Sequence, residues 1–382
     1  MIALTTARRI GAVLIALTLM VFSAQAVAAE EHDGHEGPTV VATGLDQPRQ
    51  LAFNGRGDLF IGEAGSGGDL EEVGFYAGAP HCTGLTGAVT RVDKQGRQRR
   101  VVTGLPSSAQ CDGGAQAGGP TGLVPKGRDS IVIQMGSTAS INPSTDLTIG
   151  SDIYGRTLRT RKNGTVQATI ADIAGFEASN DLDGEGYDSN PTDIAAYGRN
   201  YVVVDGGGNS VHVISNTGRL IRTVEVPQAP CPGGPGNCFG DEDLDSVPTG
   251  VVRGLGDTFY ISTLSGVVAD FSVSPPVIGF QPGNGKIFAF NARTGDIVEF
   301  ADGLTTAIDV AFDRQANVVY AAEFVTGAVY AFDADTAERT RVDQPGDLVT
   351  PGGLAVDRSG DLYVSTFTAA PGKIGQVVKY DR

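Results

Sequence analysis

The sequence repeats one short phrase six times. In each copy, an apolar strand is followed by a turn rich in Gly and Asp and then by a second strand in which apolar and polar residues alternate. The copies start at Pro48, Pro120, Pro191, Pro248, near Ala307, and at Pro351. Short alternating strands in a repeated array are typical of a β-propeller, in which each repeat forms one blade. The sequence therefore predicts an all-β, six-bladed propeller of the NHL/TolB-like kind.

The two ends of the repeated region complement each other. The last copy stops after its third strand, near Tyr380, whereas Val40–Leu45 resembles the outer strand that follows other copies. An N-terminal strand that completes the last blade would close the ring and leave no unpaired edge. We therefore expect one domain over residues 40–382, with no second domain.

The N-terminus has the pattern of an export signal. Arg8 and Arg9 precede an apolar run over residues 10–22, and small residues follow up to Ala28. This order predicts a signal peptide over residues 1–28. The alternative, an uncleaved membrane anchor, needs about 20 apolar residues. We expect a secreted, periplasmic or envelope-associated protein with no membrane segment after removal of the leader.

Residues 29–39 read as a flexible acidic tail. The tail contains His32 and His35, which could chelate a transition metal, although such tails are often mobile and without measurable function.

The formal net charge of −16 limits the classes of partner. A surface this acidic argues against nucleic acids and anionic membranes, both of which attract basic patches. It is compatible with metal cations. We expect a monomer whose partner is a small molecule or an extracytoplasmic protein.

The cysteines and the longest insertions fall in loops that should emerge on one face of the ring. In an exported chain, an even number of cysteines indicates disulfides first. We favour the pairs Cys82–Cys111 and Cys231–Cys238; a metal site that includes His81 is the alternative.

Polar residues gather where the strands meet this same face. The candidates for binding a ligand or a cation are Arg49, Glu63, Asn190, Asp193, Asp205, Asn209, Asp309 and Glu323. Carboxylate and amide oxygens around a propeller axis could hold Ca²⁺. Equally, Asp and Glu at strand ends can cap turns by accepting hydrogen bonds from loop amides. The spacing leaves both interpretations open.

Two acidic segments could form local cation sites. Residues 180–185 have the D-x-D-G spacing of a calcium loop but lack its later bidentate Glu, and residues 241–245 contain four acids. The candidate metal ligands are Asp181, Asp183, Asp241, Asp243 and Asp245. The alternative is a pair of solvated acidic loops. His212 lies on a predicted strand, and we expect a structural role for it.

Several phrases resemble the ScyD/ScyE family. They are Gly44-Leu45 with Pro48-Arg49, Glu63-Ala64-Gly65, the segment from Cys82 to Arg91, Ser189-Asn190-Pro191, the segment from Asp205 to Asn209, and the segment from Thr350 to Val356. The resemblance runs from about Val40 to the C-terminus. It implies an exported NHL-like six-bladed propeller from a family named for an association with the sunscreen pigment scytonemin, and it brings no catalytic residue.

Two functions follow from these observations. The first is a non-catalytic, exported binding or scaffold propeller, because no Gly-x-Ser-x-Gly, His-Glu-x-x-His or Walker motif is present. The alternative is a Ca²⁺-dependent hydrolase of the lactonase/phosphotriesterase kind, in which the cation is a Lewis acid and a carboxylate is the base. The ring of acids and amides that such an enzyme would need is partial, with Thr263 and Thr366 at two of its positions. Catalytic residues are therefore not assigned.

Overall fold

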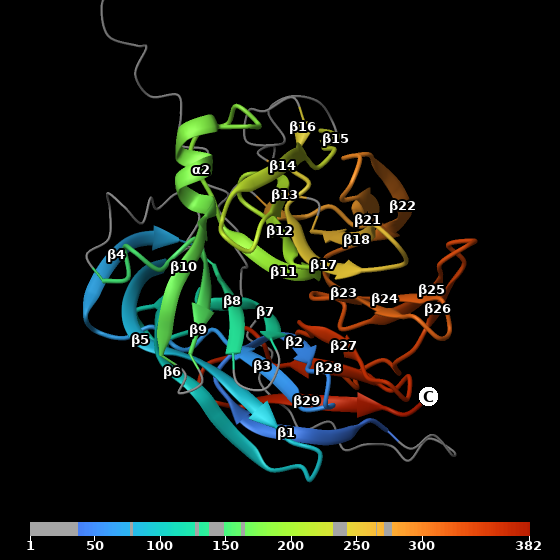
Figure 1. The fold of residues 1–382 in the computed structure, drawn as a ribbon, viewed down its shortest axis with the longest axis horizontal. Coiled ribbons are helices and arrows are strands. Elements are labelled where there is room, and N and C mark those ends of the chain that lie inside the picture. Colours follow the sequence, from blue (N-terminus) through green and yellow to red (C-terminus); the bar gives the residue numbers. More distant parts are fainter. Residues whose placement is uncertain are drawn as a thin grey trace, which may run out of the picture.

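A computed structural model describes residues 37–76, 79–126, 130–136, 149–161, 165–231, 243–264, 266–270 and 277–382. The protein is a six-bladed β-propeller, which confirms the predicted fold (Figure 1). The expected signal peptide lies outside these residues, and so does the expected tail up to residue 36. The first strand, β1, begins at Thr39.

The blades follow the six repeats of the sequence. Blade 1 consists of β2 (Pro48–Phe53), β3 (Leu59–Glu63), β5 (Ala79–Val92) and β6 (Gln98–Gln110), with β4 (Glu71–Tyr76) paired to the first residues of β5. Blade 2 consists of β7 (Pro120–Lys126), β8 (Ser130–Met135), β9 (Arg156–Thr160) and β10 (Val166–Asp172). Blade 3 consists of β11 (Pro191–Tyr197), β12 (Asn200–Asp205), β13 (Ser210–Ile214) and β14 (Leu220–Glu225).

The second half of the ring is built in the same way. Blade 4 consists of β17 (Pro248–Arg253), β18 (Thr258–Thr263), β21 (Gly285–Asn291) and β22 (Ile297–Leu304). Blade 5 consists of β23 (Ala307–Asp313), β24 (Val318–Glu323), β25 (Val329–Asp333) and β26 (Arg339–Arg341). Blade 6 consists of β27 (Leu354–Val356), β28 (Leu362–Thr366), β29 (Gly375–Tyr380) and β1 (Thr39–Leu45).

The N-terminal strand closes the ring as predicted. β1 pairs antiparallel with β29, from Thr39 opposite Lys379 to Leu45 opposite Gly375. Blade 6 therefore combines strands from both ends of the described chain, and their antiparallel pairing, which contains two register shifts, holds the ring shut.

Six clusters of the hydrophobic core in the described residues each lie between two neighbouring blades, and two smaller clusters lie among the loops of the upper face. Val204 and Val211 of blade 3, for example, pack against Phe259 of blade 4, and all three are fully buried. The other five clusters between blades join the remaining pairs around the ring in the same way. This division follows from the alternation of the strands, since alternate residues of each blade face opposite neighbours.

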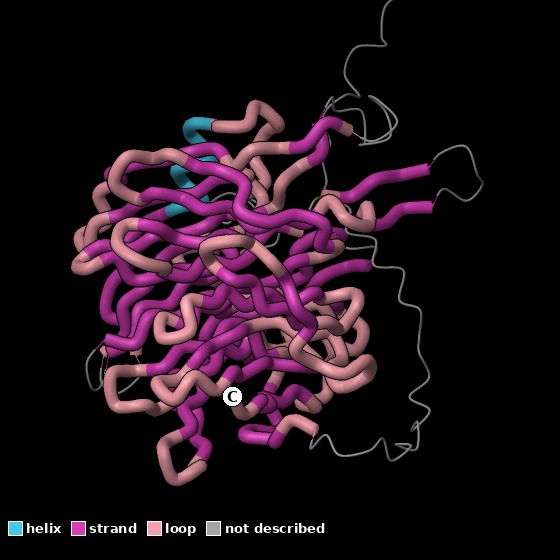
Figure 2. The backbone as a smooth tube through the Cα atoms, turned by 90° about the vertical axis from the view of Figure 1, so that its right-hand side faces the viewer, coloured by secondary structure: helices cyan, strands magenta, loops and turns pink. Residues whose placement is uncertain are grey.

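The insertions gather at one end of the strands, which we call the upper face. It is the end at which the innermost strands begin, at Pro48 in blade 1, and the opposite end is the lower face. The helix α2 (Ile173–Asn180) follows the upper end of β10, and the hairpins β15 (Ala229–Pro230)–β16 (Asp243–Leu244) and β19 (Val267–Asp270)–β20 (Val277–Phe280) follow the upper ends of β14 and β18. Figure 1 shows α2, β15 and β16 at the periphery of the ring, and Figure 2 shows the helix in cyan among the strands. No helix in the described part of the chain is long and apolar enough to cross a membrane.

One predicted disulfide is confirmed at this face. Cys82 and Cys111 are bonded, with an S–S distance of 2.03 Å. Cys231 is also disulfide-bonded, and its expected partner, Cys238, lies outside the described residues.

Candidate metal centre

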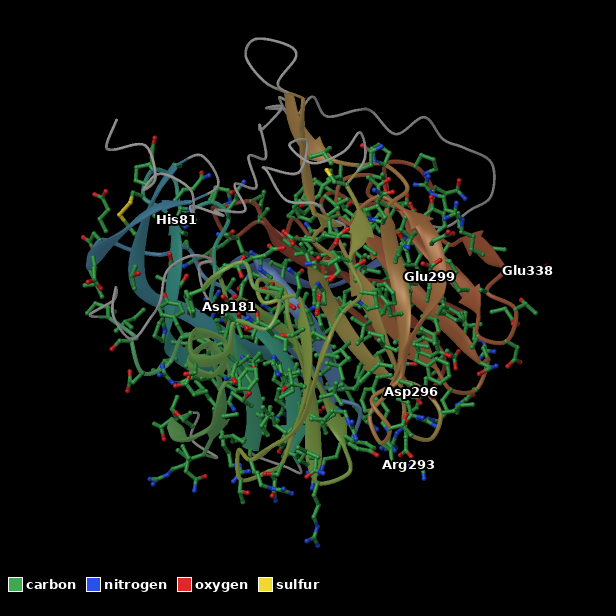
Figure 3. The ribbon with its side chains drawn as sticks, turned by 90° about the horizontal axis from the view of Figure 1, so that it is seen from above. His81, Asp181, Arg293, Asp296, Glu299 and Glu338 are labelled. Carbon is green, nitrogen blue, oxygen red and sulfur yellow. A yellow bond between two sulfur atoms is a disulfide. The ribbon has the colours of Figure 1, made fainter. Side chains whose placement is uncertain are left out.

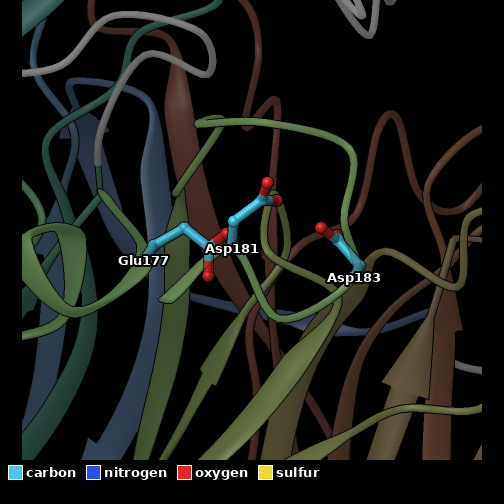
Figure 4. A group of neighbouring side chains, drawn as sticks. All are labelled: Glu177, Asp181 and Asp183. Atoms are coloured by element: carbon cyan, nitrogen blue, oxygen red, sulfur yellow. The ribbon is translucent and has the colours of Figure 1, made fainter. Parts of the chain in front are cut away.

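A group of carboxylates lies on the upper face between α2 and blade 3. Asp172 caps the N-terminus of α2 by accepting a hydrogen bond from the Gly175 N–H at 2.8 Å. Asp181 ends the helix in a left-handed conformation with φ 44°. This turn brings Asp181 and Asp183 back towards Glu177, so that carboxylate oxygens of the three residues lie within 4.8 Å of one another (Figure 4).

The turn between β12 and β13 forms the opposite wall of this site. At Gly207 and Gly208, a side chain would collide with Asp188 and Glu177, respectively. A Cβ on Gly207 would lie 1.6 Å from the Asp188 carbonyl oxygen, and one on Gly208 would lie 2.6 Å from Oε2 of Glu177. The Gly-rich turn therefore allows the backbone to approach the acidic residues closely.

Asn209 connects this turn to two further acids. Its Nδ2 donates hydrogen bonds to Oδ2 of Asp183 at 3.0 Å and to Oδ1 of Asp245 at 3.1 Å. Its Oδ1 accepts a hydrogen bond from the Val247 N–H at 3.0 Å, in the loop that leads to β17. Asn209 thus holds the α2 loop and the entry to blade 4 in one network.

Two acids of this site, Glu177 and Asp188, are buried with carboxylate oxygens that have no hydrogen-bond partner among the described residues. Glu177 is 1 % exposed and Asp188 is 7 % exposed. Within the described residues, neither oxygen of Glu177 and not Oδ1 of Asp188 has a hydrogen-bond partner. A buried carboxylate in this condition is costly in free energy unless a proton or a cation neutralises it.

The electrostatics of the site raise the pKa values of its acids. Burial, followed by the charges of Asp205, Asp183 and Asp181, raises the pKa of Glu177 to about 8. Burial and neighbouring carboxylates, led by that of Asp205, raise the pKa of Asp188 to about 10. The strongest charges acting on both residues are thus negative, which is the environment that attracts a cation.

The acids in the second predicted metal segment have different environments. Asp245 belongs to the network around Asn209, whereas Asp243 is exposed on β16. Asp241 lies outside the described residues. Sequence reasoning missed Glu177 and Asp188 because they stand outside the D-x-D-G spacing. The nearest signal for them was the run of three glycines after Asp205, which indicates a close approach of backbone.

The polar residues that end the second strands have capping contacts. Oε2 of Glu63 accepts a hydrogen bond from the Asp46 N–H at 2.8 Å, and Oε1 of Glu323 accepts one from the Thr305 N–H at 2.7 Å. Oδ1 of Asp205 accepts one from the Asn190 N–H at 2.7 Å. Each of these carboxylates therefore holds the loop that leads into the innermost strand of its own blade.

Arg49 also has structural contacts. Its guanidinium donates hydrogen bonds to the carbonyl oxygens of Thr368 at 2.9 Å and Ala117 at 2.6 Å, and so connects loops of different blades. His212, as expected, has structural contacts: its ring lies within hydrogen-bond distance of the Ser210 and Thr223 hydroxyls. It also packs edge-on against Phe176 of α2 at 5.3 Å.

Asp193 and Asp309 belong to a different group, at the propeller axis. The third residues of the six innermost strands or the turns before them alternate between polar side chains and glycine: Gln50, Gly122, Asp193, Gly250, Asp309 and Gly353. Oδ2 of Asp193 accepts a hydrogen bond from the Val251 N–H at 2.9 Å, and Oδ2 of Asp309 accepts one from the Leu354 N–H at 2.7 Å. Each carboxylate thus joins its blade to the next.

The glycines of this axial ring make room for the acids. A Cβ on Gly122 would lie 2.7 Å from Oδ1 of Asp193, and one on Gly250 would lie 2.2 Å from Oδ1 of Asp309. Burial raises the pKa values of both acids, that of Asp309 to about 7, and the charge of Asp309 raises that of Asp193 further. The structure therefore does not bring the predicted polar residues together: Asp193 and Asp309 belong to the axial ring, Asn209 belongs to the α2 site, and Arg49, Glu63 and Glu323 hold loops of other blades.

A cavity of about 500 Å³ opens elsewhere on the upper face, between the loops of blades 1 and 6. Its polar lining residues include Asp46, Ser66, Asp69, Gln110 and Lys373. Asp46 is 3 % exposed, and burial raises its pKa. The cavity is a candidate site for a small polar molecule.

Comparison with known proteins supports the fold and leaves the function open. No protein-family model matches the chain, and no curated protein sequence matches it. A streptogramin B lyase structure is 13 % identical, with a TM-score of 0.50 over 90 % of this chain and 96 % of that one.

The PQQ-bound aldose sugar dehydrogenase from Streptomyces coelicolor is 14 % identical, with the same TM-score and the same coverage. At these identities the likeness shows a shared propeller fold only. The resemblance to the ScyD/ScyE family is not confirmed by these comparisons and remains a prediction from the sequence.

Proposed function

We propose that the protein is an exported binding propeller that holds one Ca²⁺ ion between α2 and blade 3. The observation that carries this proposal is the burial of Glu177 and Asp188, because both oxygens of Glu177 and Oδ1 of Asp188 have no hydrogen-bond partner among the described residues. A cation would neutralise these oxygens together with Asp181 and Asp183, and so remove the free-energy penalty of burying like charges.

The donor set favours Ca²⁺ over other metals. Every candidate ligand is an oxygen: the group formed by Glu177, Asp181 and Asp183 includes no Cys or His of the described residues, either of which would favour a softer metal. The ligands come from irregular loops, a geometry that suits the six to eight flexible ligands of Ca²⁺ better than the strict octahedron of Mg²⁺. No contact of the described residues favours the hydrolase alternative over a binding function.

In this proposal, the cation organises the upper face for binding. It would join α2 to the β12–β13 turn, which Asn209 connects to the loop before β17. The cavity between blades 1 and 6 lies on the same face and offers both carboxylate and ammonium groups, from Asp46 and Lys373. We therefore infer a small polar ligand, held by loops that disulfides and a cation keep in place.

The proposal is tested by thermal unfolding of metal-stripped protein with and without Ca²⁺. At a Ca²⁺ concentration of about 100 times Kd, ligand binding adds ~2.7 kcal/mol to the free energy of unfolding. At ~2.1 cal/mol/K per residue over roughly 350 residues, this corresponds to a rise in Tm of about 4 °C. Glu177→Gln and Asp188→Asn should each abolish most of the rise, whereas Asp243→Asn, an exposed acid nearby, should preserve it. No rise for the unaltered protein would refute the proposal.

The pH dependence of Ca²⁺ binding provides a second test. Because the pKa of Glu177 is raised to about 8 and that of Asp188 to about 10, the free site holds two protons at neutral pH, which Ca²⁺ must displace if both acids are ligands. Apparent affinity should then increase by up to about a hundredfold per pH unit below pH 8 and by up to about tenfold per unit between pH 8 and pH 10. Isothermal titration calorimetry in two buffers of different ionisation enthalpy would detect the released protons. Binding without proton release would contradict the assignment of Glu177 as a ligand.

A further inference from the structure

Blades 2 and 3 carry opposite charges at their two ends. The carboxylates of the α2 site lie at the upper ends of the strands, and basic residues lie at the lower ends. Six cations of the described residues lie near the lower ends of these two blades: Lys126, Arg159, Arg161, Arg199, Arg219 and Arg222. Of these, Arg161, Arg199 and Arg219 are exposed. We call these six residues the basic sector.

The basic sector differs from the rest of the lower face because the described residues in the lower turns of blades 2 and 3 include no Asp or Glu, whereas each of the other blades has at least one acid there. None of its six cations has an acidic partner among the ion pairs of the described residues. On blade 4, by contrast, Arg293 pairs with Asp257 at 2.9 Å. Figure 3 shows Arg293 beside Asp296 at the lower edge of the molecule, well separated from Asp181.

The contacts that Lys126 and Arg159 make within the basic sector do not neutralise their positive charges. Nζ of Lys126 lies 4.7 Å from the ring centroid of Tyr201. Burial and the neighbouring Arg159 lower the pKa of Lys126, so the two cations repel each other without an intervening acid. The Arg159 guanidinium donates to the Asn216 carbonyl oxygen at 3.0 Å, which fixes its position and leaves its charge uncompensated.

The negative charges of the upper face do not cancel the positive electrostatic field of the basic sector. Six-residue strands such as β12 separate the two faces by about 20 Å, at ~3.3 Å per residue. The Debye length at physiological ionic strength is only ~8 Å. A surface approaching the basic sector would therefore experience six positive charges rather than the net charge of −16.

Exposed apolar residues adjoin these cations. Ile221 is 40 % exposed beside Arg222, and Val166, which begins β10, is 38 % exposed. Neither cavity described for this chain is lined by residues of the basic sector. Arg161, Arg199 and Arg219 lie at or beside turns, and exposed apolar residues adjoin the sector. This combination suits the boundary between headgroups and acyl chains, whereas a soluble polymer is usually bound in a charged groove.

From this arrangement we propose that the basic sector docks the propeller on an anionic lipid surface. The acidic face with the α2 site and the cavity would then point away from the membrane. This inference goes beyond the proposed function, because it concerns the opposite face and requires no Ca²⁺.

The test is flotation of the purified protein with phosphatidylcholine vesicles, with and without phosphatidylglycerol. We expect binding to the anionic vesicles at ~0.15 M salt and its loss near ~1 M, where the Debye length is only ~3 Å. Each cation near an anionic membrane contributes about a fivefold increase in affinity. The triple variant Arg161→Gln, Arg199→Gln, Arg219→Gln should therefore bind about a hundredfold more weakly.

A matched triple variant controls for net charge. Arg293→Gln, Arg314→Gln and Arg358→Gln remove three lower-face cations outside the basic sector and should leave vesicle binding nearly unchanged. Glu177→Gln should also leave it unchanged, which separates this test from that of the Ca²⁺ site. Circular dichroism would verify that each variant is folded.

Four results would overturn the inference. They are equal binding to neutral vesicles, no binding to anionic vesicles, equal losses in the two triple variants, and binding to soluble dextran sulfate without binding to vesicles. Salt-sensitive self-association that consumes the basic sector in the absence of lipid would assign this surface to a second copy of the chain instead.

Discussion

The axial ring makes a sharp prediction about Asp309. In the folded protein, burial raises its pKa from 3.8 to about 7. An acid whose folded pKa is raised stabilises the fold least when it is ionised. Stability should therefore fall as the pH rises from about 4 to about 7 and change little from this group above that range. Asp309→Asn removes the charge and keeps an oxygen that can accept the Leu354 N–H.

The expected change in the free energy of unfolding follows from the shift in the pKa of Asp309. At ~1.4 kcal/mol per pKa unit, the rise from 3.8 to about 7 corresponds to at most about 4 kcal/mol. This shift already includes the opposing effect of the hydrogen bond from Gln50. We therefore expect Asp309→Asn to increase the free energy of unfolding by ~1–3 kcal/mol at about pH 8 and by much less at about pH 4.

Urea unfolding at these two pH values measures the difference directly. The matched control is Asp335→Asn, an exposed acid in the turn between β25 and β26, which should shift neither midpoint. If Asp309→Asn were destabilising at the higher pH, the ionised carboxylate would have to be compensated by its surroundings. In that case, our reasoning about the axial ring would be wrong.

Two further predictions concern the buried contacts of blade 1 and its loops. Arg100 donates to both oxygens of fully buried Glu63, at 3.0 and 2.6 Å, so Arg100→Gln should lower the free energy of unfolding by ~3 kcal/mol by leaving a buried charge unpaired. Adding Glu63→Gln should recover part of this loss, and full additivity in the double-mutant cycle would contradict a direct pairing. The Cys82–Cys111 disulfide closes a loop with a sequence separation of 29. Replacing both cysteines by Ser should cost about 3.5 kcal/mol through the greater entropy of the unfolded chain, and an unchanged Tm would show that the loop is already ordered without the bond.

Much of the fold could be predicted because repetition exposes it. The prolines at Pro48 and Pro120 begin innermost strands as expected, and Val40–Leu45 completes the last blade. In blade 6, the first strand begins at Leu354, three residues after the proline that marks the repeat. These features are local or periodic, so they can be read from residue order alone.

The candidate site was less accessible from the sequence. The D-x-D-G spacing drew attention to Asp181 and Asp183, which the structure places close together. It did not draw attention to Glu177 or Asp188, whose importance depends on their burial and on the absence of hydrogen-bond partners. Similarly, the spacing of Glu63 could not distinguish a capping residue from a cation ligand, because that choice depends on which loop amide lies opposite.

The sequence by itself determined the number of blades, the closure of the ring and the face that carries the insertions. These follow from periodicity and from the alternation of strands. Only the tertiary structure decided where the charges lie. Composition averages them into a net charge of −16, whereas the antiparallel blades carry Glu177 and Asp188 to one face and Arg161 and Arg199 to the other. Screening over the length of a strand makes these faces electrostatically independent, and so permits two different kinds of binding surface on one small ring.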